Sequence, residues 1–310
     1  MTPRLSLEAL AALDAIERQG SFAAAAAELH RVPSALTYTV QKLESDLGAK
    51  LFDRSGRRAT LTPAGRELLD EGRQLLALAA DLESRVRQVA KGWEVELRIA
   101  LDNLVPAESL LEEIPAFERL ATGTRLRLSY EVLGGTWDAL INGRADLAIG
   151  ASGEPPSLSG YTVREMNRVR FLFCVAPHHP LANASEPLRP AQILAHRAVA
   201  VGDTSRNAPP RSSGLLSGQQ ILVVPDFAAK VAAQRMGVGA GYLPEPLAKE
   251  EAKAGALLIK RVAEPKQEAT QYLAWRSGAK GKALAWWIER LDPKACARAV
   301  ARQRVTRVTS

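Results

Sequence analysis

The chain has 310 residues, of which 46% are hydrophobic and 24% charged, and its formal net charge is +7. This composition is that of an ordinary globular protein and excludes the collagen-like, low-complexity and disulfide-rich classes. No stretch approaches the roughly 18 apolar residues of a membrane span and no signal peptide is recognisable, so a cytoplasmic protein without a membrane partner is expected. Cys174 and Cys296 are isolated thiols without CxxC spacing, which argues against a disulfide framework or a structural zinc site.

Three helices are predicted at the N-terminus. The first begins after Ser6 as its N-cap and ends at Gly20. The second, over 22–29, is almost pure alanine, and such small side chains let two helices cross closely. The third opens with Pro33, whose fixed φ suits a first helical turn. Spacings of three and four residues predict that its buried stripe comprises Ala35, Leu36, Thr39, Val40 and Leu43.

The other faces of the third helix carry hydroxyl, amide and ammonium groups, which suit phosphates and base edges. The segment 48–58 that follows is basic and reverses at Gly56, as expected of a wing lying along a DNA backbone. An alanine-rich run alone is usually just a helix and a basic turn is usually solvated surface, so it is their order and spacing that favour DNA binding. The residues expected to contact DNA are Ser21, Arg31, Ser34, Thr37, Tyr38, Gln41, Lys42, Arg54, Arg57 and Arg58.

Residues 7–66 resemble the winged helix-turn-helix of the LysR-type transcriptional regulators. The matching segments are 7–10, 20–26, Leu29, 33–35, 42–44, 47–48, 51–54 and 61–65. The sequence of residues 31–36 also resembles that of the YhaJ-like branch of the family. Arg31 and Val32 stand where the family commonly has a Ser or Thr cap and Gln, and Tyr38 stands where Arg, His or Gln is usual. The operator sequence therefore does not transfer from other members.

One long helix is predicted over 63–91, capped by Thr62 and opened by Pro63. Large and small residues alternate along it with a heptad period. Packing on its own chain is an alternative, but a helix of this length has few other segments of its own chain to cover it. A dimer helix is favoured, and the resemblance implies that it pairs two DNA-binding domains (residues 1–62, which we call the head) on one pseudo-palindromic site. The predicted dimerisation residues are Leu68, Leu75, Ala79, Leu82, Val86 and Val89.

The remainder alternates strands with helices, which predicts a parallel sheet with helices on both faces. The first set is strands 95–101, 125–133 and 146–150 with helices 106–120 and 136–142. The second set is strands 171–176, 198–202, 221–224 and 257–262 with helices 191–196 and 227–236. A strand over 272–275 and a helix over 279–291 close the chain. The resemblance implies that these last two return to the first lobe, with crossovers near 161–164 and 263–267.

The predicted fold class is therefore α/β, with three parts. A winged helix-turn-helix occupies 1–62, a linker and dimerisation helix occupies 63–92, and a two-lobed, periplasmic-binding-protein-like effector domain occupies 93–310. Within the last part, lobe I is expected over about 93–162 and 267–293 and lobe II over about 163–266. The basic tail 294–310 could touch DNA, although a solvated chain end is the simpler interpretation.

A two-lobed α/β module binds its ligand between the lobes, at the carboxyl ends of strands and the N-termini of helices. Gly134 and Gly135 open a short helix with amide donors for an anion, and Trp137 and Phe227 offer rings for stacking. A small organic acid, aromatic or not, is therefore expected as the effector, although Trp137 could equally be a core residue and Asp203 could simply close a turn. The residues expected to bind it are Asp102, Asn103, Leu104, Gly135, Thr136, Trp137, Val201, Gly202, Asp203, Thr204 and Phe227.

No catalytic or cofactor motif accompanies this pattern. The glycines of 237–241 follow a predicted helix rather than a strand, unlike a dinucleotide fingerprint. His178 and His179 have no third ligand nearby, which predicts a surface loop rather than a metal site. We therefore expect no enzyme, no metal and no cofactor.

The predicted function is an effector-responsive, DNA-binding transcriptional regulator. Its expected partners are double-stranded DNA, a small-molecule effector, further copies of itself as a homodimer or homotetramer, and RNA polymerase. The alternative is a solute-binding α/β protein or an enzyme that uses its N-terminal helices only to dimerise.

Overall fold

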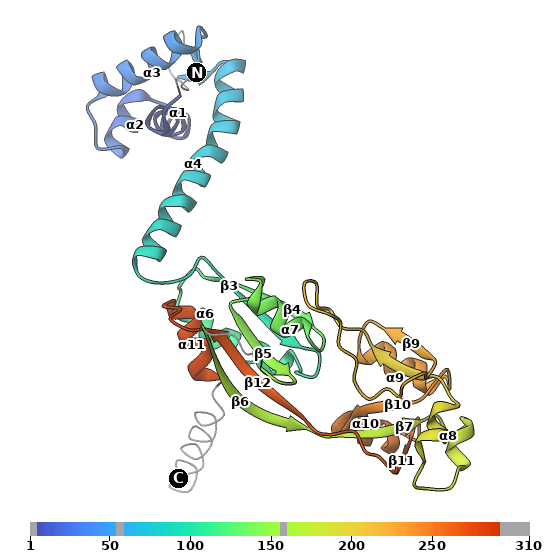
Figure 1. Ribbon diagram of the computed structural model, residues 1–310. Helices are drawn as coiled ribbons and strands as arrows, with labels where there is room; N and C mark the ends of the chain where they lie inside the picture. The colour runs from blue at the N-terminus through green and yellow to red at the C-terminus, as the bar shows by residue number, and fades with distance from the viewer. Residues whose placement is uncertain (1–4, 54–58, 156–159, 292–310) are drawn as a thin grey trace, which may run out of the picture. The chain divides into compact units, whose positions relative to one another are not determined.

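The computed structural model describes residues 5–53, 59–155 and 160–291 (Figure 1). The chain divides into two compact units, and the boundary in the sequence falls between Ala90 and Lys91. Three predicted wing cations, Arg54, Arg57 and Arg58, lie outside the described residues, as do Cys296 and the basic tail. Within the described ranges, no helix is both long enough and apolar enough to cross a bilayer.

The first unit begins with the three helices that the sequence predicts. They are α1 (Leu7–Gln19), α2 (Phe22–Glu28) and α3 (Pro33–Leu47). Ser6 caps α1 by accepting a hydrogen bond from the Ala9 amide, and Gly20 ends it in the left-handed conformation, with φ 68°. Ser21 caps α2 in the same way through the Ala24 amide. Leu36, Val40 and Leu43 of α3 are buried as predicted, whereas Ala35 and Thr39 are half-buried.

A short wing closes the core of this unit. Strand β1 (Phe52–Asp53) pairs antiparallel with β2 (Thr60–Leu61). The buried carboxylate of Glu44 on α3 accepts hydrogen bonds from the amides of Leu51 at 2.8 Å and Phe52 at 3.3 Å, and Lys50 donates to it at 3.0 Å. Burial by itself would raise the pKa of Glu44, but these donors hold it below its usual value. Glu44 thus fastens the start of the wing to α3.

Helix α4 (Pro63–Ala90) has a covered half and an uncovered half. Gly72 lies against α1 so closely that a Cβ there would come within 2.7 Å of Leu10 Cδ2, and Leu68 packs on the head core. Beyond Arg73 five large apolar side chains of α4 are exposed; they are Leu75, Leu78, Leu82, Val86 and Val89. The expectation that little of its own chain covers this helix is therefore wrong for its first part, because Gly72 lets α1 approach.

In the second unit, a five-stranded sheet forms what we call lobe I. Its order is β4 (Arg125–Glu131), β3 (Glu96–Asp102), β5 (Leu147–Ser152), β12 (Ala269–Arg276) and β6 (Tyr161–Val169). Strands β3, β4 and β5 are parallel, but β12 runs antiparallel to both of its neighbours. The prediction of a wholly parallel sheet is wrong at this strand, which re-enters the sheet from the far lobe.

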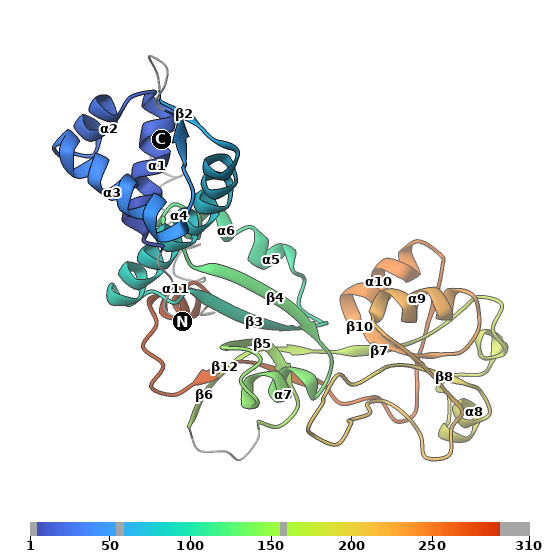
Figure 2. The same ribbon diagram turned by 90° about the horizontal axis from the view of Figure 1, so that it is seen from above.

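Helices cover both faces of this sheet (Figure 2). On one face, Leu97, Ile99 and Leu101 pack in a core with α11 (Lys282–Arg290), α5 (Glu108–Leu111) and α6 (Ile114–Glu118). On the other, α7 (Gly135–Ile141) lies on small residues, and Ala100 packs with Ala139 and Ala145. Alternation along β3 thus separates a large-residue face from an alanine face, as a period of two requires.

Lobe II is built around β7 (Phe171–Val175), which pairs antiparallel with β10 (Gly241–Pro244) and β11 (Leu258–Lys260). Strands β8 (Ala198–Val201) and β9 (Ile221–Val224) form a separate parallel pair. Its helices are α8 (Pro190–Leu194), α9 (Phe227–Arg235) and α10 (Glu245–Lys253), with a 3-10 turn η1 (Pro180–Asn183). Figure 1 shows α9, α10, β9 and β11 gathered around β7 and β10.

Two local expectations are wrong, and three elements were not predicted. The helix predicted over 106–120 is two short helices, because Pro115 lies in the first turn of α6 and cannot continue α5. The first crossover does not lie near 161–164, because that segment starts the nine-residue edge strand β6, and the chain changes lobes around Arg170. Elements β6, β10 and α10 have no counterpart in the predicted series; β6 is a half-exposed edge strand rich in charges, so its pattern resembles a loop.

Candidate functional site

The exposed side of α3 gathers most of the described residues predicted to contact DNA. Tyr38 is 66% exposed and Ser34, Gln41 and Lys42 are exposed beside it. Thr37 is half-buried and its hydroxyl donates to the Pro33 carbonyl at 3.0 Å. This face presents a ring, an amide and an ammonium to solvent, which is what base edges and phosphates require.

Ser21 and Arg31 have structural partners within the head. The Ser21 hydroxyl oxygen is occupied by capping α2. The Arg31 guanidinium, in the turn before α3, forms an ion pair with Glu8 of α1. A groove lined by Ser6, Glu8, Arg31, Tyr38 and Lys42, among others, runs along this face. Arg31 is therefore held in place at the edge of the exposed face of α3.

The second candidate site is a cavity between the two lobes, with a volume of about 210 Å³. Lobe I contributes Asp102 and Ser152, and lobe II contributes Phe227, Lys230 and Tyr242. The remaining lining residues are Asn103, Leu104, Val132, Leu133, Gly153, Phe171, Val201, Arg211, Ser212, Ser213, Lys266 and Ala269. Apolar and aromatic walls with a few converging polar groups are typical of a small-molecule site.

Three cations line the cavity, Arg211, Lys230 and Lys266, and burial acts on the two lysines. Lys230 on α9 is 6% exposed, and in the part of the chain that the structure describes no oxygen accepts a hydrogen bond from it. Burial, together with the neighbouring charge of Lys266, lowers the pKa of Lys230 to about 7. Burial likewise lowers the pKa of Lys266 to about 8. The Nζ of Lys266 lies 3.5 Å from the Phe171 ring centroid, a cation–π contact.

Asp102 is the acidic group of the cavity. It ends β3 and is 2% exposed. Its carboxylate accepts hydrogen bonds from the Leu104 amide at 3.0 Å and from the Ser152 hydroxyl at 3.5 Å. Burial outweighs these donors and raises the pKa of Asp102 to about 7. Within the described ranges no lysine or arginine forms an ion pair with it, so the cavity contains buried acidic and basic groups that lack ion-pair partners.

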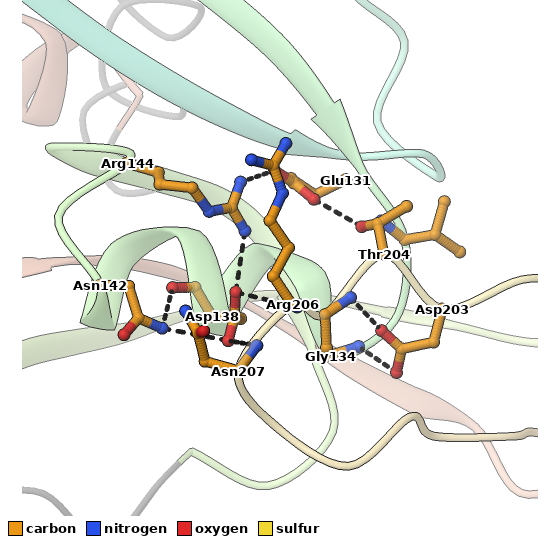
Figure 3. A network of polar contacts seen from close by, with 11 residues as sticks. Glu131, Gly134, Asp138, Asn142, Arg144, Asp203, Thr204, Arg206 and Asn207 are labelled. Carbon is orange, nitrogen blue, oxygen red and sulfur yellow. Dashed lines mark hydrogen bonds and ion pairs between the residues drawn. The ribbon is translucent and has the colours of Figure 1, made fainter.

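The loop after β8 fastens lobe II to lobe I by a polar network (Figure 3). The Thr204 hydroxyl donates to Glu131 Oε2 at 2.5 Å and accepts from the Val132 amide at 2.9 Å. Asp203 Oδ2 accepts from the Gly134 amide at 3.2 Å, at the start of α7. These contacts cross between the lobes beside the cavity. We call the network the interlobe clasp.

Asp138 is the centre of the interlobe clasp. Its carboxylate accepts from the backbone amides of Arg206 at 3.2 Å and Asn207 at 3.1 Å, and from the Arg144 guanidinium at 2.9 Å. Arg144 also pairs with Glu131, so one cation bridges two buried acids (Figure 3). Burial alone would raise the pKa of Asp138, but Arg144 and the two amides hold it below its usual value.

The structure divides the predicted effector residues into two groups. Those that line the cavity are Asp102, Asn103, Leu104, Val201 and Phe227. Those outside the lining are Gly135, Thr136, Trp137, Gly202, Asp203 and Thr204. Asn103 also bridges the lobes, because its Oδ1 accepts a hydrogen bond from the Phe227 amide at 3.3 Å.

The start of α7 is not a free anion site. The Gly134 amide donates to the Asp203 carboxylate, and the Gly135 amide donates to the Val132 carbonyl at 3.0 Å. Trp137 is 3% exposed, donates to the Ser152 carbonyl at 3.1 Å and packs in the core near Tyr272. The expectation that Trp137 stacks on a ligand is therefore replaced by its alternative, a core residue.

The sequence analysis found Asp102 but missed the three cations of the cavity lining, Arg211, Lys230 and Lys266. Lys230 sits in the segment Phe227–Arg235, where it is a lone lysine among alanines and valine, and this could have served as a signal. Lys266 and Arg211 lie in segments without periodicity and carry no such signal.

His179 is buried, contrary to the surface loop predicted for the histidine pair. Its Nδ1 accepts a hydrogen bond from the Leu181 amide at 3.2 Å, and its ring lies 4.9 Å from that of His196. Cys174 is also buried, and burial raises the pKa of its thiol to about 12. Neither residue lines the cavity.

Comparisons with known proteins agree with this division of the chain. Residues 7–66 match the family model "Bacterial regulatory helix-turn-helix protein, lysR family", and residues 90–295 match "LysR substrate binding domain". The chain is 43% identical to the uncharacterized regulator YeeY of Escherichia coli K12 over 285 residues, 92% of each chain. It is 39% identical to the probable regulator YhaJ of the same strain, over 93% of this chain and 96% of the other.

Among solved structures, the Corynebacterium glutamicum OxyR C206 mutant superposes with a TM-score of 0.63 at 17% identity, covering 99% of this chain and 98% of that one. At this identity the likeness concerns the fold alone. The family models and the two relatives together establish that the chain is a DNA-binding transcriptional regulator with an effector-binding domain, and that it belongs to the LysR family.

Proposed function

We propose that a small organic anion, bound in the interlobe cavity, controls how this regulator binds its operator. The observation that carries the proposal is the buried ammonium of Lys230, which has no acceptor among the described residues although it faces the cavity. A buried charge without a partner is costly, and an anionic ligand would remove that cost. The anion would lie between Lys230 and Lys266, against the rings of Phe171 and Phe227.

The protein acts as a homodimer or higher homo-oligomer in the cytoplasm, where its DNA target resides. The exposed apolar stripe from Leu75 to Val89 on α4 supports self-association, because a second copy would cover it. Two heads would then place their α3 helices in successive major grooves. The role is regulatory rather than enzymatic, and RNA polymerase is the partner through which it would act.

The test is fluorescence anisotropy of the full-length protein on the DNA upstream of its own reading frame, in a salt series with scrambled competitor. We expect sequence-preferring binding that weakens steeply with salt. The Lys42→Ala variant should weaken binding on all sequences and reduce the salt slope by about one unit, as for a lost phosphate contact. Binding that ignores sequence would favour the alternative, in which the N-terminal helices only dimerise a solute-binding protein.

The effector half of the proposal is tested with benzoate and succinate in the same assay. A change in affinity or in DNA bend angle with either anion, abolished in Lys266→Met, is the expected result. An effect that survives removal of both cavity lysines would place the effector elsewhere.

A further inference from the structure

The amine of Lys230 is buried, lies at the wall of an open cavity and has no ion-pair partner among the described residues. Its Nζ lies 5.9 Å from the Phe227 ring centroid and close to the backbone of Gly241. Among the described side chains, no carboxylate forms an ion pair with it. A lysine with a carboxylate partner stays protonated and unreactive, whereas a desolvated lysine becomes a neutral amine, which is a nucleophile.

A second cation occupies the same cavity. Lys266 stands over the Phe171 ring at 3.5 Å and provides a partner for an anionic group of a ligand. Its charge also disfavours protonation of Lys230. A desolvated amine beside another cation is the arrangement by which proteins activate lysine toward carbonyl compounds.

The geometry points to a covalent use of this cavity: Lys230 binds anionic aldehydes or ketones reversibly as imines, while Lys266 holds their anionic group. This deepens the proposed function and rests on it, because it specifies the chemical class of the effector for the same cavity. An effector of this class would be retained longer than a simple carboxylate, since a bond must be hydrolysed before it leaves.

The reaction balances without an oxidant or a reductant. The Lys230 nitrogen attacks the carbonyl carbon, and the two hydrogens of the neutral amine end on the carbonyl oxygen, which leaves as water. A carbon–nitrogen double bond replaces the carbon–oxygen double bond. Asp102, with its pKa raised to about 7 by burial, lies in the same cavity and can give a proton to the departing oxygen and take one back.

The size of the cavity restricts the ligand. About 210 Å³ accommodates a single substituted ring, and the walls include the rings of Phe171, Phe227 and Tyr242. An aromatic aldehyde that carries a carboxylate offers its ring to these walls, its carbonyl to Lys230 and its anion to Lys266.

The experiment uses 4-formylbenzoate as the probe. The full-length protein is incubated with it near neutral pH, the imine is reduced with cyanoborohydride, and the adduct is located by intact mass and peptide mapping. We expect one addition per chain at Lys230, formed at least about tenfold faster than on an exposed lysine such as Lys253. Lys230→Met should abolish this addition, and Lys253→Met should leave it unchanged.

Two matched compounds separate the contribution of the anionic group from that of the carbonyl group. Benzaldehyde lacks the anion and should label Lys230 about tenfold more slowly, as should 4-formylbenzoate with Lys266→Met. The compound 4-methylbenzoate lacks the carbonyl and should protect Lys230 from labelling. Adducts mapped to exposed lysines only, at a rate that 4-methylbenzoate does not change, would overturn the inference even if Lys230→Met failed to fold.

The same data distinguish this failure from failure of the proposed function. If 4-methylbenzoate raises the melting temperature of the wild type but not of Lys266→Met, and Lys230 is not labelled, the cavity binds anions and the imine inference alone is wrong. If 4-methylbenzoate has no effect and no label reaches Lys230, both the imine and the anion cavity are rejected.

Discussion

The interlobe clasp and the interlobe cavity lie side by side between the same two lobes, yet they treat charge in opposite ways. In the clasp, Asp138 accepts from Arg144 and two amides, and its pKa is held low. In the cavity, Lys230 and Asp102 are as deeply buried but lack ion-pair partners in the described chain, and burial brings the pKa of each to about 7.

The difference distinguishes buried polar groups that stabilise the fold from buried polar groups that are available to a ligand. A buried network whose members are all satisfied fixes one arrangement of the chain. Buried charges without partners oppose folding, and they persist where a bound molecule supplies the missing partner. The clasp residues Asp203 and Thr204 resemble ligand contacts in the sequence, but the structure assigns them to holding the lobes together.

Removing the centre of the clasp should have the largest effect. Asp138→Ala leaves two backbone amides without their acceptor and removes one of the two acidic partners of Arg144, and we expect it to lower the free energy of unfolding by about 3 kcal/mol or more. All five tryptophans lie between Trp93 and Trp287, so urea unfolding followed by tryptophan fluorescence reports on the second unit alone. The control is Glu165→Ala, which removes an exposed pair with Arg168 and should change little.

In the cavity, by contrast, we expect a substitution that raises the free energy of unfolding. Lys230→Met keeps the length of the side chain and removes a buried charge without a partner. The free energy of unfolding of the ligand-free protein should rise by about 2 kcal/mol. The same urea experiment measures it. A loss of stability in this variant would mean that Lys230 has a structural partner and that the contrast between clasp and cavity is wrong.

Thr204→Val should have a smaller cost, about 1–2 kcal/mol, because the Val132 amide loses its acceptor and Glu131 loses one donor. Because valine has nearly the same shape as threonine, the substitution leaves no void. Thr162→Val removes an exposed hydroxyl contact with Ser277 and is the matched control. Equal effects from the two variants would show that the clasp contributes no more than a surface contact.

The pH dependence gives the finest test. The pKa of Asp102 is raised to about 7, so the folded state binds more protons than the unfolded state above about pH 4, and stability falls as pH rises toward 7. The pKa of Lys230 is lowered to about 7, so the unfolded state binds more protons above pH 7, and stability rises from there toward pH 10. The ligand-free protein should therefore show a shallow minimum near pH 7.

Each flank of that minimum has its own variant. Asp102→Asn should flatten the acidic side by about 1 kcal/mol and leave the alkaline side unchanged. Lys230→Met should leave the acidic side unchanged and reduce the alkaline rise by a similar amount, and the rise that remains comes from Lys266, whose pKa burial lowers to about 8. Urea denaturation midpoints of the wild type and both variants, measured from pH 5 to pH 9, test these two changes. A profile that is the same in both variants and in the wild type would contradict the assignment of unpartnered charges to the cavity.

The head could be predicted almost entirely from the sequence. The caps Ser6 and Ser21, the stop at Gly20 and the start at Pro33 act within one helical turn of their own residues, so local chemistry decides them. The order of strands and helices in the lobes follows from the same local periodicity. The edge strand β6 was missed because its exposed, charged face hides the alternation of a strand.

The cavity and the clasp depended on tertiary structure. Asp102 and Lys230 are far apart in the chain, and which of their charges finds a partner depends on how the two lobes approach. The sequence determined that this protein has a helix-turn-helix head, a long helix and two α/β lobes, because each rests on short-range pattern. Only the tertiary structure decided that Asp203 and Thr204 join the lobes, that Lys230 lines the ligand space and that Asp102 has no ion-pair partner there, because hydrogen-bond satisfaction is a property of three-dimensional neighbours.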